Sequence, residues 1–241
     1  MISVCMATYN GEKFIKEQIS SILKQLSLND ELIISDDGST DNTIKIINDF
    51  NDSRIKLVYN EGVHGFVGNF ENSLKYANGD YIFLADQDDV WVDNKVEICC
   101  EYLKKYDFVV HDCYQTNEDL SIYCNSRFEK YSLKRGYLRL YIKMRFIGCC
   151  MAFTKRFLKI CLPFPKKHDL LEHDTWIVSV AERYFKYQLI SDKLLLYRRH
   201  GNNTSDGGEK SKNSLFNKIY RRIYRFKEIS KLKKKFRSET K

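Results

Sequence analysis

Short apolar runs alternate with longer amphipathic segments through the first hundred residues, and this alternation constrains the fold more than any other feature. Ile2–Thr8 has the continuous apolar character of a buried strand, and Glu12–Leu26 follows it with apolar side chains at helical spacing. Repeated βα units of this kind predict an α/β fold with a mostly parallel central sheet and helices on both faces. Further strands are expected at Glu31–Ser35, Ile55–Tyr59 and Tyr81–Ala85, and further helices at Thr43–Phe50 and Asn69–Ala77.

Beyond about Asp107 the alternation becomes less regular, and the pattern predicts shorter elements that complete the sheet. No internal repeat is visible in this part of the chain. Strands are expected at Phe108–His111, Cys149–Thr154, Tyr187–Ile190 and Leu194–Arg198, and helices around Arg135–Lys143 and Asp174–Tyr184.

The net charge of +8 comes from the C-terminal segment alone, because the rest of the chain is slightly acidic. Residues 210–241 hold 13 Lys and Arg against two Glu, which leaves about −3 for residues 1–209. Within residues 215–236, apolar side chains recur at helical spacing with basic side chains between them. We expect a basic amphipathic helix that binds an anionic membrane surface through residues 210–241, with a solvated helix that packs its apolar stripe on the body as the alternative. The residues concerned are Phe216, Ile219, Ile223, Phe226 and Ile229, with Lys218, Arg221, Arg222 and Arg225 between them.

The eight cysteines do not form a disulfide or metal-binding pattern, because no C-x-x-C occurs and several lie within apolar runs. The chain starts directly on a strand, without a basic segment or a cleavage site. No stretch approaches the roughly 20 apolar residues that a membrane span needs. We therefore expect a protein of the reducing cytoplasm.

Polar clusters follow three of the predicted strands at the point where each strand ends. They are Thr8–Glu12, Asp36–Ser39 and Asp86–Asp89. Parallel sheets bind ligands at the carboxyl ends of their strands, so we expect these three loops to form one site.

The acids Asp86, Asp88 and Asp89 are typical ligands for a hard divalent cation, which takes a few carboxylate oxygens and leaves positions for phosphates. The same acids would also suit a helix N-terminus, where Asp caps the helix. Asp36 and Asp37 precede Gly38 in a predicted turn, and one of the two is free to accept hydrogen bonds from a base or ribose.

Two clusters in the second half allow both a structural and a chemical role. Asp174 can cap the helix that follows it, or act as a general base near an acceptor hydroxyl. His200 ends the last predicted strand, where a lone histidine is more often structural. Arg198 and Arg199 suit either a solvated surface or phosphate contacts.

Four ordered motifs resemble those of family 2 glycosyltransferases, an inverting family with the GT-A fold. They are Ala7–Gly11, Ser35–Asp41, Ala77–Ile82 and Ala85–Trp91, and the resemblance covers roughly residues 1–205. The form of the last motif, with Glu172–Trp176 and His200–Asn203, is most similar to the bacterial polysaccharide branch, which includes rhamnosyl- and glucosyltransferases.

The resemblance implies roles for individual residues. Asp174 would be the catalytic base, and Asp88, His200 and Asp86 would bind a divalent cation, Mn²⁺ or Mg²⁺. Acceptor contacts are expected from Trp91, Glu172, His173 and Trp176. Donor contacts are expected from Thr8, Tyr9, Asn10, Glu12, Asp36, Asp37, Asn69, Asp86, Gln87 and Arg199.

Three positions depart from the family pattern. Ala7 stands where Pro is common, His173 where the family usually has Glu, and Gly68–Phe70 replaces a frequent Arg-Asn segment. The last two departures concern the identity of donor and acceptor more than the class of reaction.

The implied function is transfer of a hexose from a nucleotide diphosphate sugar to a lipid-linked glycan, in capsule or O-antigen synthesis, at the inner face of the membrane. Residues 1–106 would bind the nucleotide sugar, 107–205 would hold the acceptor and base, and 206–241 would form the basic tail. A non-catalytic nucleotide-sugar-binding or assembly protein on a degenerate transferase fold is the main alternative. A nucleotidyltransferase fits less well. Those enzymes usually carry a Gly-rich, basic N-terminal segment that binds the triphosphate, whereas Thr8–Glu12 has only one Gly before Lys13. Nucleic-acid binding is disfavoured by the slightly acidic body.

Overall fold

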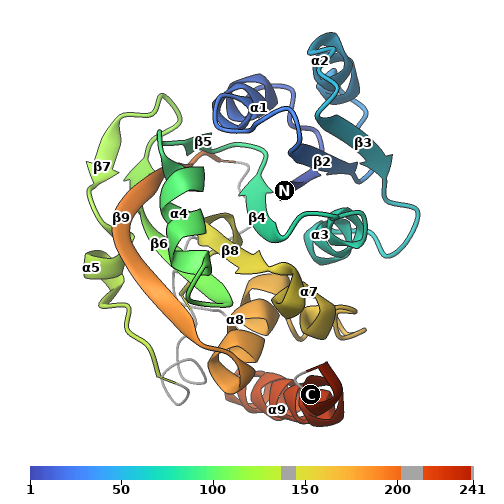
Figure 1. The fold of residues 1–241 in the computed structure, drawn as a ribbon, viewed down its shortest axis with the longest axis vertical. Helices are drawn as coiled ribbons and strands as arrows, with labels where there is room; N and C mark the ends of the chain where they lie inside the picture. The colour runs from blue at the N-terminus through green and yellow to red at the C-terminus, as the bar shows by residue number, and fades with distance from the viewer. Residues whose placement is uncertain (137–144, 202–213, 240–241) are drawn as a thin grey trace.

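The computed structural model describes residues 1–136, 145–201 and 214–239 of the 241-residue chain. Within these residues one nine-stranded sheet runs through both halves, in the order β3-β2-β1-β4-β8-β6-β9-β5, with β7 paired to β6 (Figure 1). The strands are β1 (Ile2–Thr8), β2 (Glu31–Asp36), β3 (Ile55–Tyr59), β4 (Tyr81–Asp86), β5 (Val90–Trp91), β6 (Phe108–Thr116), β7 (Ile122–Cys124), β8 (Met151–Thr154) and β9 (Tyr187–Arg198).

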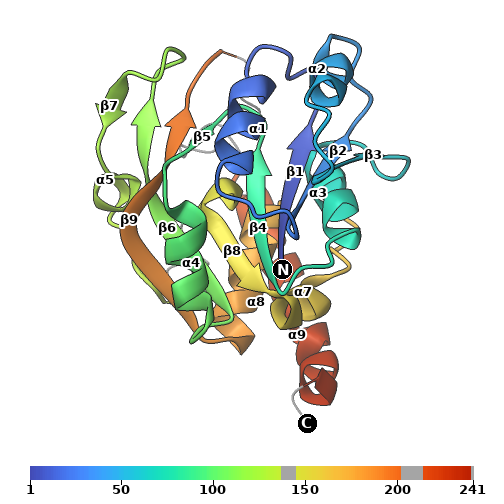
Figure 2. The same ribbon diagram turned by 45° about the horizontal axis from the view of Figure 1, so that its top comes forward.

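Helices cover both faces of the sheet. In Figures 1 and 2, α1, α2 and α4 lie on one face, and α3, α7 and α8 lie on the other. The helices are α1 (Ile15–Leu23), α2 (Thr43–Asp49), α3 (Phe66–Lys75), α4 (Lys95–Leu103), α5 (Arg127–Tyr131), α7 (Lys155–Cys161), α8 (His173–Tyr184) and α9 (Leu215–Glu239), with the 3₁₀ turn η1 (Gly148–Cys150).

The first half confirms the predicted βα alternation. β1 pairs in parallel with β2 and β4, and β2 pairs in parallel with β3. Ile15, Ile19 and Ile22 of α1 are fully buried, as their helical spacing predicts. The side chains of β1, β2 and β4 are largely buried on both faces of the sheet, which is the reason for the continuous apolar runs in the sequence.

The second half of the sheet is mixed. β8 is antiparallel to both β4 and β6, whereas β9 runs parallel to β6. The two strands expected at Tyr187–Ile190 and Leu194–Arg198 are one strand, β9, whose register against β6 shifts beside His111 and Asp112. The first residues of the strand expected at Cys149–Thr154 form η1. The helix expected around Arg135–Lys143 falls largely on residues outside those described.

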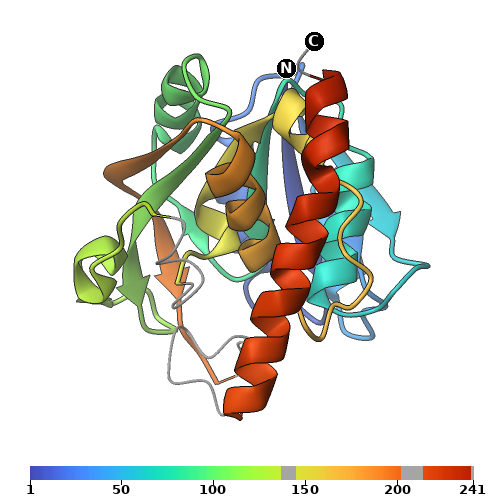
Figure 3. The same cartoon turned by 90° about the horizontal axis from the view of Figure 1, so that it is seen from below.

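α9 lies outermost on the face that carries α7 and α8 and contacts both helices (Figure 3). Its inner side is apolar: Ile229 is buried, and Phe236 packs against Tyr184 and Phe185. Tyr184 also donates a hydrogen bond to the Ile229 carbonyl at 2.8 Å. None of the helices in the described residues is both long and apolar enough to cross a membrane.

Candidate active site

The predicted polar loops meet at one edge of the sheet because β1 lies between β2 and β4. The register sets Thr8 beside Asp36 on one side and Ala7 beside Asp86 on the other. The three loops that follow these strands therefore share the carboxyl edge of the sheet, as the sequence predicts.

Gln87 fastens the first and third loops together. Its side-chain oxygen accepts hydrogen bonds from the Thr8 hydroxyl at 2.6 Å and the Tyr9 amide at 2.9 Å, and its amide group donates to the Tyr9 carbonyl. A Cβ on Gly11 would lie 2.4 Å from that oxygen, so a glycine is required there for this contact. Thr8 and Gln87 thus build the wall of the site, while the Tyr9 ring is exposed.

The two neighbouring acids of the second loop have different roles. Asp36 is buried and accepts hydrogen bonds from the amides of Gly38 and Ser39, so its carboxylate closes its own turn. Asp37 points instead toward the loop after β3. It accepts hydrogen bonds from Asn60 at 2.6 Å and Gly65 at 2.7 Å, and it pairs with the exposed His64.

Three other predicted donor residues hold the loops in place. Asn10 accepts a hydrogen bond from the Thr40 amide, and Glu12 accepts two from Asn42. Asn69 is buried on α3 and donates to the Thr8 carbonyl at 3.0 Å. In this conformation their polar side chains bind neighbouring loop residues, so their role is to position the loops of the site.

Asp88 and His200 come together although they are 112 residues apart. His200 Nε2 lies 2.8 Å from Asp88 Oδ2, and both side chains are largely buried. The His200 ring packs against Phe14 in a tilted arrangement, with 4.7 Å between the ring centroids. An oxygen and a nitrogen ligand side by side fit the donor set of a Mn²⁺ or Mg²⁺ site, with Asp86 close by.

Arg198, for which the sequence left a solvated surface or phosphate contacts open, organises this cluster from a buried position. Its side chain is buried and donates to the carbonyls of Asp88 at 2.8 Å and Glu118 at 2.7 Å, and it pairs with Glu17. Its main-chain amide donates to Asp89 Oδ1 at 2.9 Å. Arg198 therefore fixes the end of β9, which carries His200, to the loop that carries Asp88. Arg199, its neighbour, is half-buried and donates its amide to the Thr116 carbonyl.

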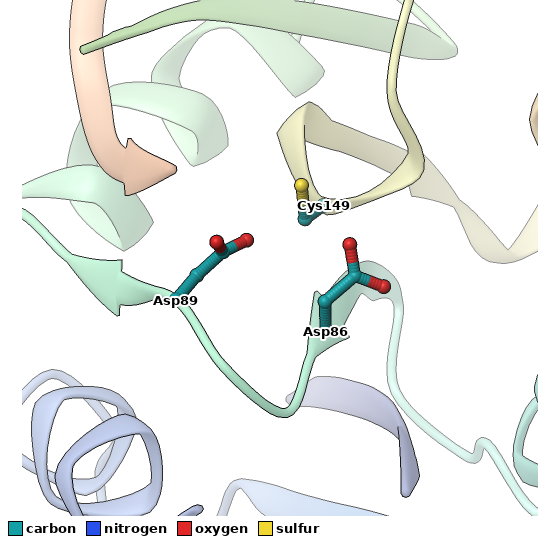
Figure 4. A group of neighbouring side chains, drawn as sticks. All are labelled: Asp86, Asp89 and Cys149. Carbon is teal, nitrogen blue, oxygen red and sulfur yellow. The ribbon is translucent and has the colours of Figure 1, made fainter. Parts of the chain in front are cut away.

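The carboxylates of Asp86 and Asp89 point toward each other and toward the thiol of Cys149 (Figure 4). Burial, together with the nearby Asp88 and Asp174 carboxylates, raises the pKa of Asp86 to about 7. Burial and the Asp88 and Asp86 charges raise the pKa of Asp89 well above its usual value. The site therefore concentrates negative charge that a cation or a proton would offset.

Asp174 lies in the first turn of α8 and faces the same cluster. His173 Nε2 is 2.7 Å from Asp174 Oδ1. Burial of the His173 ring opposes protonation, but the Asp174, Asp86 and Glu172 carboxylates outweigh it and raise the pKa of His173 above its usual value. A Cβ on Gly148 would lie 2.5 Å from Asp174 Oδ1, so η1 can pass this carboxylate only with glycine at that position.

Two of the positions that depart from the family pattern, His173 and the Gly68–Phe70 segment, contact each other. The His173 ring stacks on Phe70 of α3 with 4.3 Å between the centroids, and it meets Phe66 edge to face. Gly68 has no room for a side chain, because a Cβ would lie 1.8 Å from the Val63 carbonyl oxygen. The α3 segment that departs from the family pattern thus provides the aromatic ring, Phe70, against which His173 packs beside Asp174.

Three of the four predicted acceptor residues are buried: His173 is 6% exposed, and the two tryptophans lie in the interior. Trp91 is 3% exposed, and Trp176 is 2% exposed and donates its indole N–H to the Cys161 carbonyl. Their apolar rings complete the core, so we leave them out of the acceptor site proposed below. Glu172 is exposed, but its carboxylate is bound to Arg221 of α9 at 2.9 Å.

The model of the glycosyl transferase family 2 domain matches residues 3–161. The chain belongs to this family. Over 216 residues it is 31% identical to the dTDP-rhamnosyl transferase RfbG of Shigella flexneri, covering 82% of this chain and 72% of that protein. It is 46% identical over 98 residues to the Escherichia coli enzyme WfgD, a UDP-Glc:alpha-D-GlcNAc-diphosphoundecaprenol beta-1,3-glucosyltransferase. That alignment covers 41% of this chain and 39% of WfgD, so it spans about two fifths of each.

Solved structures of transferases share the fold. Staphylococcus aureus TarS 1–349, crystallised with UDP-GlcNAc, superposes with a TM-score of 0.66 at 16% identity, over 99% of this chain and 72% of that one. The mannosyltransferase PcManGT of Pyrobaculum calidifontis, in complex with GDP-Man and Mn²⁺, gives 0.61 at 19% identity, over 80% and 54%. At these identities the likeness shows the fold alone, which is the predicted GT-A fold.

Proposed function

We propose that this protein is an inverting, cation-dependent glycosyltransferase that moves a hexose from a nucleotide diphosphate sugar to a glycan hydroxyl. The observation that carries the proposal is the convergence of Asp86, Asp88, His200 and Asp174 on one cluster, although they come from three separate segments of the chain. Such convergence gives a phosphate-directed cation site beside a carboxylate that can act as a base.

The donor would lie along the rim built by Thr8, Gln87 and Asp37. Asp37 is the only one of the two second-loop acids that faces outward from its own turn, so it is the acid suited to a base or ribose. Because His64 and Asn60 already hold its carboxylate, donor binding would replace or share these hydrogen bonds.

Asp88 and His200 would hold the cation, with Asp86 beside them. The bound cation would neutralise charge on the leaving diphosphate. Asp174 would accept the proton of the attacking acceptor hydroxyl, and the single displacement would invert the anomeric carbon. His173 would keep Asp174 oriented through their 2.7 Å contact.

The acceptor would enter beside His173 and Glu172, at the start of α8. The relatives act on rhamnosyl and glucosyl donors, and the name of WfgD specifies a diphosphoundecaprenol-linked acceptor. By extension, we propose a lipid-linked glycan of a bacterial surface polysaccharide as the acceptor.

A donor screen tests the activity. The purified protein with Mn²⁺ or Mg²⁺ is offered UDP-glucose, UDP-N-acetylhexosamines, GDP-mannose and dTDP-rhamnose, and release of nucleoside diphosphate is followed. We expect slow, cation-dependent hydrolysis of one donor. If none is hydrolysed, and calorimetry with metal shows no donor binding, the proposed activity is contradicted, and a non-catalytic assembly role on the transferase fold is the alternative.

The basic tail divides into two faces, and this bears on membrane binding. Ile229 and Arg225 face the body, whereas Phe216, Ile219, Ile223 and Phe226 are exposed by 77, 46, 60 and 57%. The exposed side continues into Lys227, Lys233, Lys234 and Arg237. We propose that this exposed face binds an anionic membrane, because it offers apolar side chains for the interface and cations for the headgroups.

Flotation with liposomes tests the tail. Phe226→Glu should weaken binding to phosphatidylglycerol vesicles by roughly 10- to 100-fold, since burial of a Phe side chain contributes about 1.5–3 kcal/mol. Leu28→Glu, at an apolar position on the body that is 86% exposed, is the control and should bind like wild type. Raised salt should also weaken binding. Equal flotation of both variants would contradict the proposal.

A further inference from the structure

We propose that Asp86, Asp89 and Cys149 form a second cation site, for a zinc-type metal, distinct from the Asp88–His200 pair. One ligand atom from each residue lies within 4.8 Å of the other two (Figure 4). In a tetrahedral zinc site with bonds of about 2.0–2.3 Å, ligand atoms are separated by roughly 3.3–3.7 Å. Side-chain movements of about an ångström would therefore bring the three ligand atoms close enough together to coordinate one ion.

Asp89 provides evidence for a ligand that is independent of the clustering. Its side chain is fully buried, and its Oδ2 oxygen has no hydrogen-bond partner among the described residues. The Asp89 carboxylate is directed toward Asp86 and Cys149 (Figure 4). A buried carboxylate oxygen without a partner is costly, and a metal ion would satisfy it.

Hydrogen bonds from neighbouring groups also orient Asp89 and the main chain at Cys149, as they do around the ligands of a metal site. Asp89 Oδ1 accepts the Arg198 amide hydrogen at 2.9 Å, which fixes the orientation of the carboxylate. The Cys149 carbonyl accepts a hydrogen bond from the buried Lys95 at 2.9 Å, and the same ammonium lies 4.1 Å from the centroid of the Trp91 ring. The ammonium of Lys95 is thus directed at a carbonyl and an aromatic face.

The cysteine determines which metal would bind. A thiolate favours Zn²⁺, Co²⁺ or Cd²⁺ over Mg²⁺, whereas Asp88 and His200 offer only oxygen and nitrogen. On binding, the Cys149 thiol would lose its proton to water as the metal–sulfur bond forms. The ion would link η1, which passes Asp174, to the end of β4, which leads to Asp88. The ion would therefore connect the segment beside the proposed base, Asp174, to the loop beside the proposed donor site.

Co²⁺ is the probe that tests this site, because thiolate ligation gives a charge-transfer absorption band in the near ultraviolet. The full chain is titrated anaerobically with Co²⁺ in the absence of donor, so the result does not depend on the proposed function. We expect the band in wild type and in Asp88→Asn, its removal by Zn²⁺, and its persistence in excess Mg²⁺.

Variants assign the band to this cluster. It should disappear in Cys149→Ser and persist in Cys161→Ser, which changes another buried thiol, on α7. Asp89→Asn keeps the acceptor for the Arg198 amide and should weaken Co²⁺ binding by about 10-fold or more. Circular dichroism checks folding, and Cys149→Ala replaces Cys149→Ser if the latter unfolds. A wild type without the band, as expected if Lys95 alone balances Asp89, would overturn the proposal, and so would a band that survives in Cys149→Ser.

Discussion

Replacing Asp174 with Asn is expected to lower the rate of sugar transfer by about 10²- to 10⁴-fold, the usual contribution of a general base. The amide has nearly the same size and can still approach His173, so the start of α8 and the rim should keep their structure. Donor affinity should stay within about threefold of wild type, because Thr8, Gln87 and Asp37 are untouched. Transfer is measured with the donor that the screen identifies, and binding by calorimetry.

Asp169→Asn is the matched control, because Asp169 is an exposed acid five residues before Asp174 and has no part in the proposed site. It should transfer at the wild-type rate. If Asp174→Asn also transferred at that rate, Asp174 would not be the base. If the variant instead lost donor binding in parallel with transfer, the residue would act in binding.

The first half of the fold could be predicted closely because β1, β2 and β4 are largely buried on both faces, and because its strands alternate with helices that have a regular apolar face. β1, β2, β3 and β4 agree with the predicted strands to within one residue. The second half was harder to predict. β5 and β7 have two and three residues, too few for any periodicity, and β9 contains exposed residues beside its register shift, which split its apolar pattern in two.

The candidate site could be predicted where the chemistry was local. The loops after β1, β2 and β4 meet because parallel strands bring their carboxyl ends to one edge. Contacts from distant segments have no local signal: nothing in the sequence around Arg198 shows that it binds the carbonyls of Asp88 and Glu118. The burial of single side chains could not be predicted either. Trp176 stands beside predicted site residues in the sequence, yet its side chain lies in the core.

The second large effect is expected at the cation pair. Asp88→Asn should weaken cation-dependent donor binding by about 100-fold or more and abolish cation-dependent hydrolysis. The variant keeps the size of the side chain and a partner for His200 but loses the charge that faces the cation. Loss of an outer partner of a metal ligand already costs 10–100-fold, so loss of a direct ligand should cost at least as much. Calorimetry with Mn²⁺ and the donor measures the change.

The pH dependence of cation binding in the wild type gives a further check. Asp86, whose pKa is raised to about 7, is largely protonated below that pH and must lose its proton to face a cation as a carboxylate. Cation affinity should therefore rise as pH increases from about 6 to 8, and this rise should flatten in Asp86→Asn. Asp93→Asn, at an exposed acid beyond β5, is the control and should behave like wild type in both measurements. If Asp88→Asn bound the donor with Mn²⁺ as tightly as wild type does, the Asp88–His200 pair would be a structural ion pair, and the cation would have to be held elsewhere.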